Sequence, residues 1–273
     1  MAGLIWRMFV TRKGFHSQAG SRPRTIVQTL YPEVGAGGFS RVDGNIEFFG
    51  RVNALISPEM TILDFGAGRG KDAVDDPIAY RKHLRNFRGQ VSHVVGVDID
   101  PVVLSNPSVD RAILVEEDGV IPLADGAIDL IFSDFCFEHL RHPDLVAREL
   151  GRLLKPGGWI CARTPNKWGY IGIGAGCVPS RFHVHLADRL QPGRHAEDIF
   201  ETEYRLNTLK QIRKYFPPTL YDDYSYTYNT EPAYFGESLL ATRAARLILS
   251  RLPDTFSALL YIFLQKSRTI AAD

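Results

Sequence analysis

Short apolar runs that end at an acidic residue or a turn recur through the middle of the chain. The first run, residues 61–65, leads into glycines at alternate positions, Gly66, Gly68 and Gly70. A second run, residues 93–98, ends in an aspartate. Continuous apolar runs of this length, bounded by turn signals, are typical of strands buried in a parallel sheet. The pattern therefore predicts an α/β fold.

More strands and helices follow from the same pattern. Residues 112–115 form a short apolar strand, and residues 123–133 supply a turn and a fourth strand. Residues 148–160 read as a helix that is broken at Pro-Gly-Gly and followed by a fifth strand. Ahead of the first strand, residues 45–56 repeat apolar side chains at helical spacing, whereas residues 31–41 hold too many glycines for a helix.

The last part of the chain, after residue 166, is less regular. The pattern predicts a helix over residues 204–215, a strand over 221–228 and a last apolar strand over 257–265. Residues 238–252 form an amphipathic helix whose leucines lie near three arginines. We expect this helix to pack on the sheet; the alternative is contact with a membrane surface or a lipid-linked substrate.

Composition indicates a chain of enzyme size without a strong electrostatic field. Its 273 residues can bury a sizeable core, as one large domain or as a domain with a lid. The formal net charge of +1 argues against a nucleic-acid partner. The 3 cysteines form no Cys-x-x-Cys pair, no secretory signal is recognisable and no run is long enough to span a bilayer, so we expect a cytoplasmic location.

Two common phosphate-binding loops compete for the glycines after the first strand, and spacing argues against both. A P-loop would place its first glycine at Phe65 and its magnesium-binding hydroxyl at Asp72. A dinucleotide fingerprint would need its third glycine at Lys71, and it would place Asp64 beside a pyrophosphate. An acid at the cradle instead suggests a cationic ligand, approached by backbone N–H groups that glycines leave accessible.

In this order, the motifs resemble those of the class I S-adenosylmethionine-dependent methyltransferases, particularly the small-molecule branch. The resemblance rests on Asp-x-Gly-x-Gly-x-Gly at residues 64–70 and Leu-Lys-Pro-Gly-Gly at residues 154–158, and it covers roughly residues 62–166. It implies a Rossmann-like α/β fold with a central, mainly parallel seven-stranded sheet, an antiparallel last strand and helices on both faces. The implied cofactor is S-adenosylmethionine.

Carried over by position, the resemblance implies a cofactor site along the carboxyl edge of the sheet. Asp64 and the glycine loop would hold the methionine portion, Asp98 the ribose hydroxyls and Asp118 the adenine amine. The residues that we assign to cofactor binding are Asp64, Gly66, Ala67, Gly68, Gly70, Asp98, Ile99, Asp118, Gly119 and Ser133.

The segment after the fourth strand carries the candidate catalytic residues. An activated methyl group mainly requires the protein to align a nucleophile and exclude water, and a hydroxyl acceptor would also benefit from a general base. We assign His139 as that base or as a substrate-orienting residue, with Glu138 available to orient the imidazole. The alternative is that His139 simply closes the cofactor pocket.

The flanking segments supply the expected acceptor contacts. We assign residues 1–58 to an N-terminal lid, 59–166 to the cofactor-binding core and 167–273 to an acceptor-binding region that completes the sheet. The candidate substrate-binding residues are Tyr31, Phe39, Trp168, Arg181, His183 and His185. His183, His185 and His195 suggest a metal site, but the sequence places no carboxylate to complete a coordination shell, so no metal is expected.

The resulting hypothesis is methyl transfer from S-adenosylmethionine to an oxygen of a small molecule such as a sugar, a polyketide or a lipid-linked headgroup. A nucleic-acid methyltransferase is the first alternative; the near-neutral charge and the lack of an Asn/Asp-Pro-Pro-Tyr motif at residues 133–136 argue against it. The second alternative is a catalytically silent protein that kept the cofactor pocket for regulation or scaffolding. The oligomeric state stays open.

Overall fold

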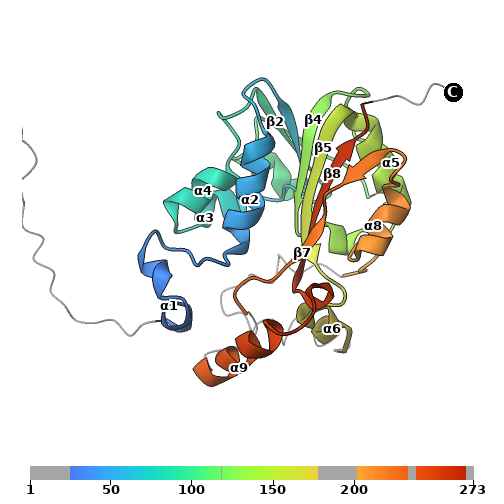
Figure 1. Cartoon of the computed structure of the whole chain (residues 1–273). Coiled ribbons are helices and arrows are strands. Elements are labelled where there is room, and N and C mark those ends of the chain that lie inside the picture. The colour runs from blue at the N-terminus through green and yellow to red at the C-terminus, as the bar shows by residue number, and fades with distance from the viewer. Residues whose placement is uncertain (1–24, 118, 178–201, 233–237, 269–273) are drawn as a thin grey trace, which may run out of the picture.

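A mainly parallel sheet forms the centre of the molecule. The computed structural model describes residues 25–117, 119–177, 202–232 and 238–268. Within these residues the sheet has eight strands in the order β3-β2-β1-β4-β5-β8-β6, and β7 also pairs with β8 (Figure 1). Strands β1 to β5 run parallel, whereas β8 is antiparallel to β5. This topology confirms the predicted Rossmann-like α/β fold.

The elements have the following bounds. The strands are β1 Thr61–Phe65, β2 His93–Asp98, β3 Arg111–Leu114, β4 Ile128–Asp134, β5 Leu154–Pro165, β6 Tyr221–Asp223, β7 Tyr226–Tyr228 and β8 Leu259–Lys266. The α-helices are α1 Ile26–Leu30, α2 Gly44–Leu55, α3 Lys71–Asp75, α4 Ala79–Arg85, α5 Pro143–Leu153, α6 Tyr170–Cys177, α8 Leu209–Tyr215 and α9 Leu239–Leu249. The 3-10 helices are η1 Pro32–Gly35, η2 Pro101–Ser105, η3 Phe137–His139 and η6 Asp254–Phe256.

Helices cover both faces of the sheet, as predicted. Side chains alternate between faces along each strand, so Leu63 joins a core cluster with α5 and α8, and the adjacent Ile62 joins a second cluster with α2 and α4. Helix α2 begins where the Asp43 carboxylate accepts hydrogen bonds from the backbone N–H groups of Asn45 and Ile46. The apolar spacing predicted over residues 45–56 therefore describes a helix that belongs to the core.

The expected seven-stranded sheet differs from the observed one at a single edge. Strands β6 and β7 pair with the two ends of β8, so they share one position in the sheet. Between them, the Tyr224 N–H donates to the Phe263 carbonyl, and the Ser225 hydroxyl accepts from the Phe263 N–H. The strand predicted over residues 221–228 is thus interrupted where a side chain replaces a backbone acceptor.

The helix and the fifth strand predicted within residues 148–160 are both present, but Pro-Gly-Gly does not separate them. Helix α5 ends at Leu153, and β5 begins at once at Leu154 and runs through the glycines. Gly157 has a φ of 79°, and a Cβ on Gly158 would lie 2.7 Å from the Asp129 carbonyl oxygen. The glycines therefore allow a bend and a close approach within the strand rather than end a helix.

The helix predicted over residues 204–215 begins only at Leu209. Tyr204 has a φ of 52°, a left-handed conformation that a helix does not accept. The Asn207 side chain donates to the Pro165 carbonyl, and the Thr208 hydroxyl then caps the helix by accepting from the Gln211 N–H. Contacts to β5 therefore override the helical periodicity of the first residues.

The amphipathic helix near the C-terminus does not pack on the sheet, contrary to prediction. Helix α9 lies beyond the carboxyl ends of the parallel strands, at the same end of the molecule as α6 (Figure 1). It buries only Thr242, Ala245 and Leu249, and Arg246 donates to the Leu30 carbonyl of α1. The large apolar side chains Leu240, Leu247 and Ile248 lie on its exposed side, so they do not cover the sheet.

Candidate functional site

The loop after β1 forms a cradle at the carboxyl edge of the sheet. Gly66, Gly68 and Gly70 have φ values of 81°, 49° and 69°, which confirms that this turn needs glycine. The N–H groups of Gly66 and Ala67 donate to the Val97 carbonyl of β2 at 2.9 and 3.1 Å. The loop is therefore fixed to the neighbouring strand, with its backbone held at the strand ends.

Two of these glycines have different surroundings. A Cβ on Gly66 would lie 2.7 Å from Cβ and Sγ of Cys136, so the loop approaches the turn after β4 closely. A Cβ on Gly68 would have no neighbouring atom within 4 Å among the described residues. The cradle is therefore closed toward Cys136 and open at Gly68, where backbone can approach a ligand.

Asp98 ends β2 and positions the loop. One carboxylate oxygen accepts from the Gly68 N–H at 2.7 Å, and the other accepts from the Asp100 N–H at 2.9 Å. Asn106 holds the same loop from outside, because its amide donates to the carbonyls of Ala67 and Gly68. Asn106 was not predicted, since an asparagine between two strands is an ordinary turn residue.

A cavity opens beside this edge and brings together several of the predicted residues. Gly66, Asp98, Ile99, Gly119 and His139 all line it. Further lining residues that the sequence did not indicate are Cys136 and the α5 residues Leu145, Val146 and Leu150. The cavity thus has a polar side at Asp98 and an apolar wall along α5, which suits a ligand with a polar sugar and a flat apolar ring.

Asp64 is a buried carboxylate at the end of β1. Its side chain accepts no hydrogen bond from the described residues. Burial, together with the negative charges of Asp134 and Asp98, raises its pKa well above the ordinary value. A bound cation would supply the positive partner that Asp64 lacks among the described residues. This environment suits the cationic ligand that the acid at the cradle suggests.

Asp134, at the end of β4, has a partner inside the protein. Burial opposes its ionisation, but the Arg163 guanidinium, which donates to it at 2.8 Å, outweighs this and lowers its pKa. The Arg163 guanidinium also lies 4.8 Å from the ring centre of Phe135, which has a φ of 55°. The segment after β4 is thus anchored on a buried ion pair, with a strained residue at its start.

Glu138 and His139 are neighbours in η3. The Nε2 atom of His139 lies 4.0 Å from Oε1 of Glu138. The other Glu138 oxygen accepts from the Thr164 hydroxyl at 2.7 Å, and Thr164 in turn accepts from the Asn207 amide at 2.7 Å. Thr164 and Asn207 were not predicted, because only the folded chain brings β5 and the segment before α8 to this glutamate.

Cys136 lies between the glycine loop and η3 but does not have the properties of a nucleophile. Burial, followed by the charges of Glu138 and Asp98, raises the pKa of its thiol. The thiol therefore stays protonated at neutral pH. Its role is to fill space against Gly66 and to form part of the cavity wall.

The remaining candidate residues lie elsewhere or outside the described residues. The Ser133 hydroxyl donates to the Phe65 carbonyl, Phe39 lies against Tyr80, and Trp168 is exposed. Tyr31 is buried under the Arg246 guanidinium. The candidates that fall outside the described residues are Asp118, Arg181, His183, His185 and His195.

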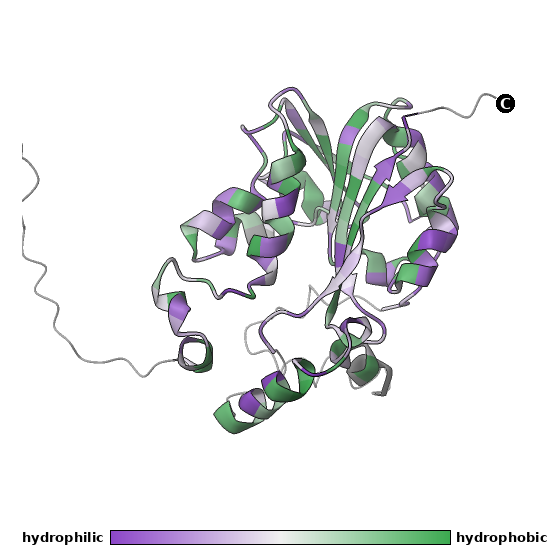
Figure 2. Cartoon of the chain, viewed as in Figure 1, coloured by the Kyte–Doolittle hydropathy of each residue, from purple (hydrophilic) through white to green (hydrophobic). Residues whose placement is uncertain are grey.

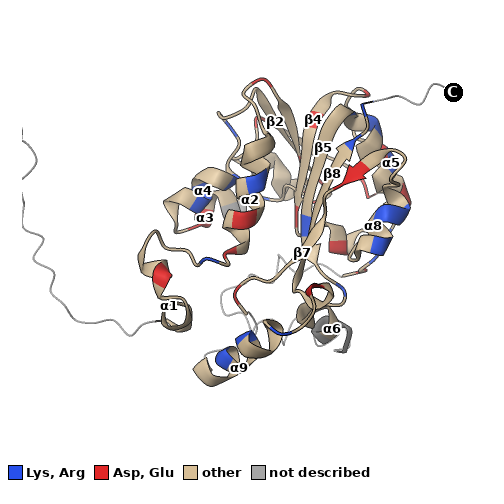
Figure 3. Ribbon diagram, in the orientation of Figure 1, with Lys and Arg blue, Asp and Glu red and all other residues tan. Residues whose placement is uncertain are grey.

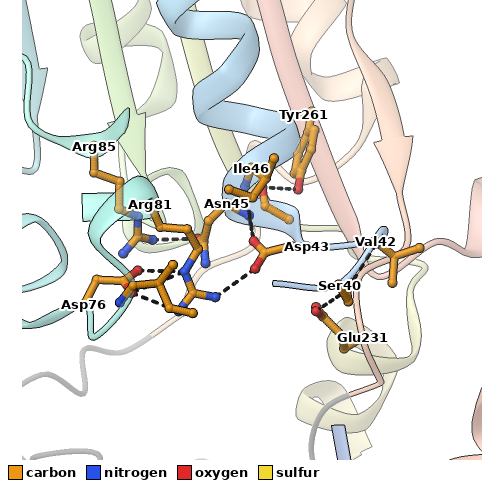
Figure 4. A network of polar contacts seen from close by, with 12 residues as sticks. Ser40, Val42, Asp43, Asn45, Ile46, Asp76, Arg81, Arg85, Glu231 and Tyr261 are labelled. Atoms are coloured by element: carbon orange, nitrogen blue, oxygen red, sulfur yellow. Dashed lines mark hydrogen bonds and ion pairs between the residues drawn. The ribbon is translucent and has the colours of Figure 1, made fainter. Parts of the chain in front are cut away.

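A network of polar contacts joins the N-terminal segment to α4 and to the segment before α9 (Figure 4). The Arg81 guanidinium donates to Asp43 at 2.7 Å and to Asp76 at 2.9 Å. The Ser40 hydroxyl donates to the Glu231 carboxylate. These contacts fix the start of α2 beside the carboxyl edge, although nothing in the sequence pattern paired these residues.

A family model described as a methyltransferase domain matches residues 38–218, about two thirds of the chain. The chain belongs to this methyltransferase family. The match includes the cradle, η3 and the segment up to α8. The predicted membership of the class I S-adenosylmethionine-dependent methyltransferases, and with it the predicted cofactor, is confirmed.

Other known proteins are similar to this methyltransferase. Malonyl-[acyl-carrier protein] O-methyltransferase 1 of Coxiella burnetii is 26% identical over 151 residues, which are 53% of this chain and 50% of that protein. This methyltransferase thus spans about half the length of that relative. A chain in the complex of the Haloferax volcanii Trm112 methyltransferase activator with a methyltransferase is 18% identical, with a TM-score of 0.50, over 84% of this chain and 93% of that chain. The latter likeness shows the fold.

The geometry of the cradle fits S-adenosylmethionine. Asp64 supplies a buried carboxyl group whose ionised form an ammonium or sulfonium group would stabilise, and Gly68 presents open backbone in the same loop. Asp98 faces the cavity with its carboxylate oriented by two backbone N–H groups, which suits hydrogen bonds from ribose hydroxyls. Among the described residues, no group of three or more histidine, cysteine, aspartate or glutamate side chains could hold a metal ion.

Proposed function

We propose that this methyltransferase transfers the methyl group of S-adenosylmethionine to an oxygen atom of a small molecule. The candidate acceptors are a sugar, a polyketide, a lipid-linked headgroup or an acyl thioester with a free carboxylate. The last of these follows the relative that is named a malonyl-[acyl-carrier protein] O-methyltransferase. The proposed division into a lid over residues 1–58, a core over 59–166 and an acceptor region over 167–273 goes with this function.

One observation carries the proposal: His139 lines the same cavity as Asp98 and has a buried carboxylate behind it. A hydroxyl acceptor must lose a proton as the new C–O bond forms. An imidazole is suited to accept that proton near neutral pH. The Glu138 carboxylate would stabilise the resulting imidazolium, and the Thr164 hydroxyl would hold Glu138 in position.

The remaining residues bind, orient and exclude water. Bound S-adenosylmethionine supplies an activated methyl group. Asp98 and the glycine loop would hold its ribose and methionine portions, and the apolar α5 wall would exclude water from the cavity. Alignment of this kind contributes about 7–11 kcal/mol in favourable cases, so most of the rate would come from positioning and a smaller factor of about 10²–10⁴ from the base.

The experiment follows a labelled methyl group. The full-length chain is incubated with S-adenosylmethionine carrying a radioactive methyl group and with separate pools of malonyl-acyl-carrier protein, sugars, polyketides, lipid-linked sugars and nucleic acid. We expect label in a small-molecule pool. Mild alkali then releases methanol from a methyl ester but not from a methyl ether, which distinguishes a carboxylate acceptor from a hydroxyl acceptor.

The variant His139→Gln tests the base. With a hydroxyl acceptor, kcat should fall by about 10²-fold or more, and the acidic limb of the pH profile should disappear. A carboxylate acceptor needs no base, so kcat would then fall by less and keep its pH profile. Label that enters only nucleic acid would contradict the proposal, and cofactor binding without turnover on any pool would favour the silent binding protein.

A further inference from the structure

Helix α9 presents apolar side chains to solvent. Leu240, Leu247 and Ile248 are 78%, 57% and 59% exposed. Figure 2 shows α9 as a largely hydrophobic helix at the end of the molecule. The exposed residues recur at spacings of seven and one, so they lie on one side of the helix, opposite the buried Thr242 and Leu249. This amphipathic helix therefore has its apolar side turned outward.

The charges around this face have one sign. Residues 239–252 contain three arginines, Arg243, Arg246 and Arg251, and no acidic residue. In Figure 3 the α9 ribbon carries the colour of basic residues and none of the colour of acidic residues. All three arginines are exposed, but Arg246 donates to the Leu30 carbonyl and lies over the Tyr31 ring, so Arg243 and Arg251 are the two considered for lipid contact. An apolar face flanked by arginines complements an anionic surface with an apolar interior.

Neighbouring segments extend the same character. Trp168, just before α6, and Ile173, within α6, are both exposed. Figure 1 shows α6 at the same end of the molecule as α9. Tryptophan is favoured where a membrane meets water, because its ring is apolar and its N–H is polar. Residues 1–24, which precede α1, contain five arginines and lysines and no acidic residue. Their charge makes them a poor cover for the arginines of α9.

We propose that α9 is a peripheral membrane-binding helix that lies in the headgroup region of an anionic phospholipid bilayer. Leu240, Leu247 and Ile248 would enter the apolar boundary, and Arg243 and Arg251 would contact lipid phosphates. Helix α9 has 11 residues, which is too short to cross a bilayer, so the proposed attachment is at the surface. Within the described residues no helix combines the length and apolar character needed to traverse a bilayer. This inference does not rest on the proposed acceptor.

The test is sedimentation of the full-length chain with vesicles. Vesicles of phosphatidylcholine with about one third phosphatidylglycerol are compared with vesicles of phosphatidylcholine alone. We expect the chain to sediment with the anionic vesicles at least about tenfold more strongly, and high salt should weaken that binding. The variant Leu240→Gln/Leu247→Gln should lower the partition coefficient at least about tenfold, because two exposed leucines no longer leave water.

A matched variant controls for loss of exposed apolar surface in general. Leu104 and Leu220, which are 62% and 52% exposed on other elements, are changed together to glutamine, and binding should stay within about twofold of wild type. The variant Arg243→Gln/Arg251→Gln should lose about tenfold on anionic vesicles and nothing on neutral ones. Binding of S-adenosylhomocysteine, measured by calorimetry, shows that each variant is folded.

Three outcomes would overturn the proposal. Wild-type chain that stays in the supernatant with both vesicle types excludes a membrane as the occupant. Vesicle binding that appears only after removal of residues 1–24 would mean that the chain's own N-terminus covers α9. A lipid-free dimer that Leu240→Gln/Leu247→Gln dissociates would mean that a second copy covers it. Failure of the wild type to bind S-adenosylhomocysteine would instead contradict the proposed function.

Discussion

Asp64 lies buried at the end of β1, where folding and ligand binding favour different protonation states. Burial and two neighbouring acids raise its pKa, so the folded chain holds this proton more tightly than the unfolded chain does. The free energy of unfolding therefore falls as pH rises through the raised pKa, and the ionised carboxylate destabilises the protein at higher pH. A bound cation favours the ionised form and reverses this effect.

The variant Asp64→Asn should therefore be more stable than wild type at pH above the raised pKa in the absence of cofactor, and it should bind S-adenosylmethionine more weakly. Each kcal/mol gained corresponds to about 2–4 °C in Tm for a chain of this size. Thermal unfolding and calorimetric titration across pH measure both effects. In wild type the affinity should rise with pH, whereas in the variant it should be flat.

Asp98→Asn serves as the comparison, because its carboxylate already accepts two backbone N–H groups. This variant should lose cofactor affinity without any gain in Tm. A fall in the Tm of Asp64→Asn, or an equal gain in both variants, would contradict the account of Asp64.

Thr164 is predicted to position Glu138 rather than to contact substrate. In Thr164→Val the buried carboxylate loses its hydroxyl donor, which costs about 1–3 kcal/mol of stability. We expect kcat to fall, KM to stay close to wild type and the pH profile of kcat to shift. Thr164→Ser keeps the hydroxyl and should restore the pH profile; if it behaves like valine, the hydrogen bond does not position the catalytic pair.

At the scale of the element, the loop between β1 and α3 combines a structural and a ligand-binding requirement. Gly66 and Gly68 both have positive φ, so alanine strains either position by roughly 1–2 kcal/mol. Only at Gly66 does the added Cβ also meet Cys136. The two positions therefore separate a packing effect from a binding effect.

Gly66→Ala should lower Tm clearly more than Gly68→Ala does. Gly68→Ala should mainly weaken cofactor binding, because its Cβ would occupy space left open for a ligand. Thermal unfolding and S-adenosylhomocysteine titration of both variants measure this difference. Equal losses of Tm would show that φ alone, and not the contact with Cys136, decides the stability of the loop.

Sequence periodicity predicted the elements whose contacts are local or face a single core. The parallel strands and the glycine cradle are of this kind, since β1 leads into the glycine turn and β2 ends at Asp98 as the pattern predicts. The pattern failed where distant contacts decide the conformation. Tyr204 and Asn207 leave the helical conformation because they bind η3 and β5, and Thr164 reaches Glu138 only through β5. For α9, periodicity gave the helix but not the direction of its apolar side.

At the scale of the whole molecule, the Arg81 network joins segments that are far apart in the sequence (Figure 4). Burial opposes ionisation of Asp76, but hydrogen bonds from Arg81 and the Ile78 N–H outweigh it and lower its pKa. The ionised Asp76 thus stabilises the fold above its unfolded pKa, near 3.8. This contribution is lost as pH falls through the lower, folded pKa.

The variant Arg81→Gln should reduce the free energy of unfolding by about 2 kcal/mol or more at neutral pH, because it leaves Asp43 and Asp76 without their cation. The effect should persist at high salt and shrink as pH falls through the lowered pKa of Asp76. Denaturant titration measures it. The control is Arg148→Gln, which removes an exposed ion pair with Asp144 and should change the free energy of unfolding by no more than about 0.5 kcal/mol. An equally small loss in Arg81→Gln would mean that the network does not stabilise the fold.

The interrupted edge beside β8 has a consequence for how copies of the chain behave at high concentration. An unbroken edge strand offers a row of free N–H and C=O groups on which another chain can build cross-chain β-structure and aggregate. Here the edge beside β8 is divided into two strands of three residues, β6 and β7. Between them, Tyr224 and Ser225 form hydrogen bonds with Phe263 of β8. The opposite edge, β3, is only four residues long. Short, broken edges of this kind offer a poor template for fibrillar association.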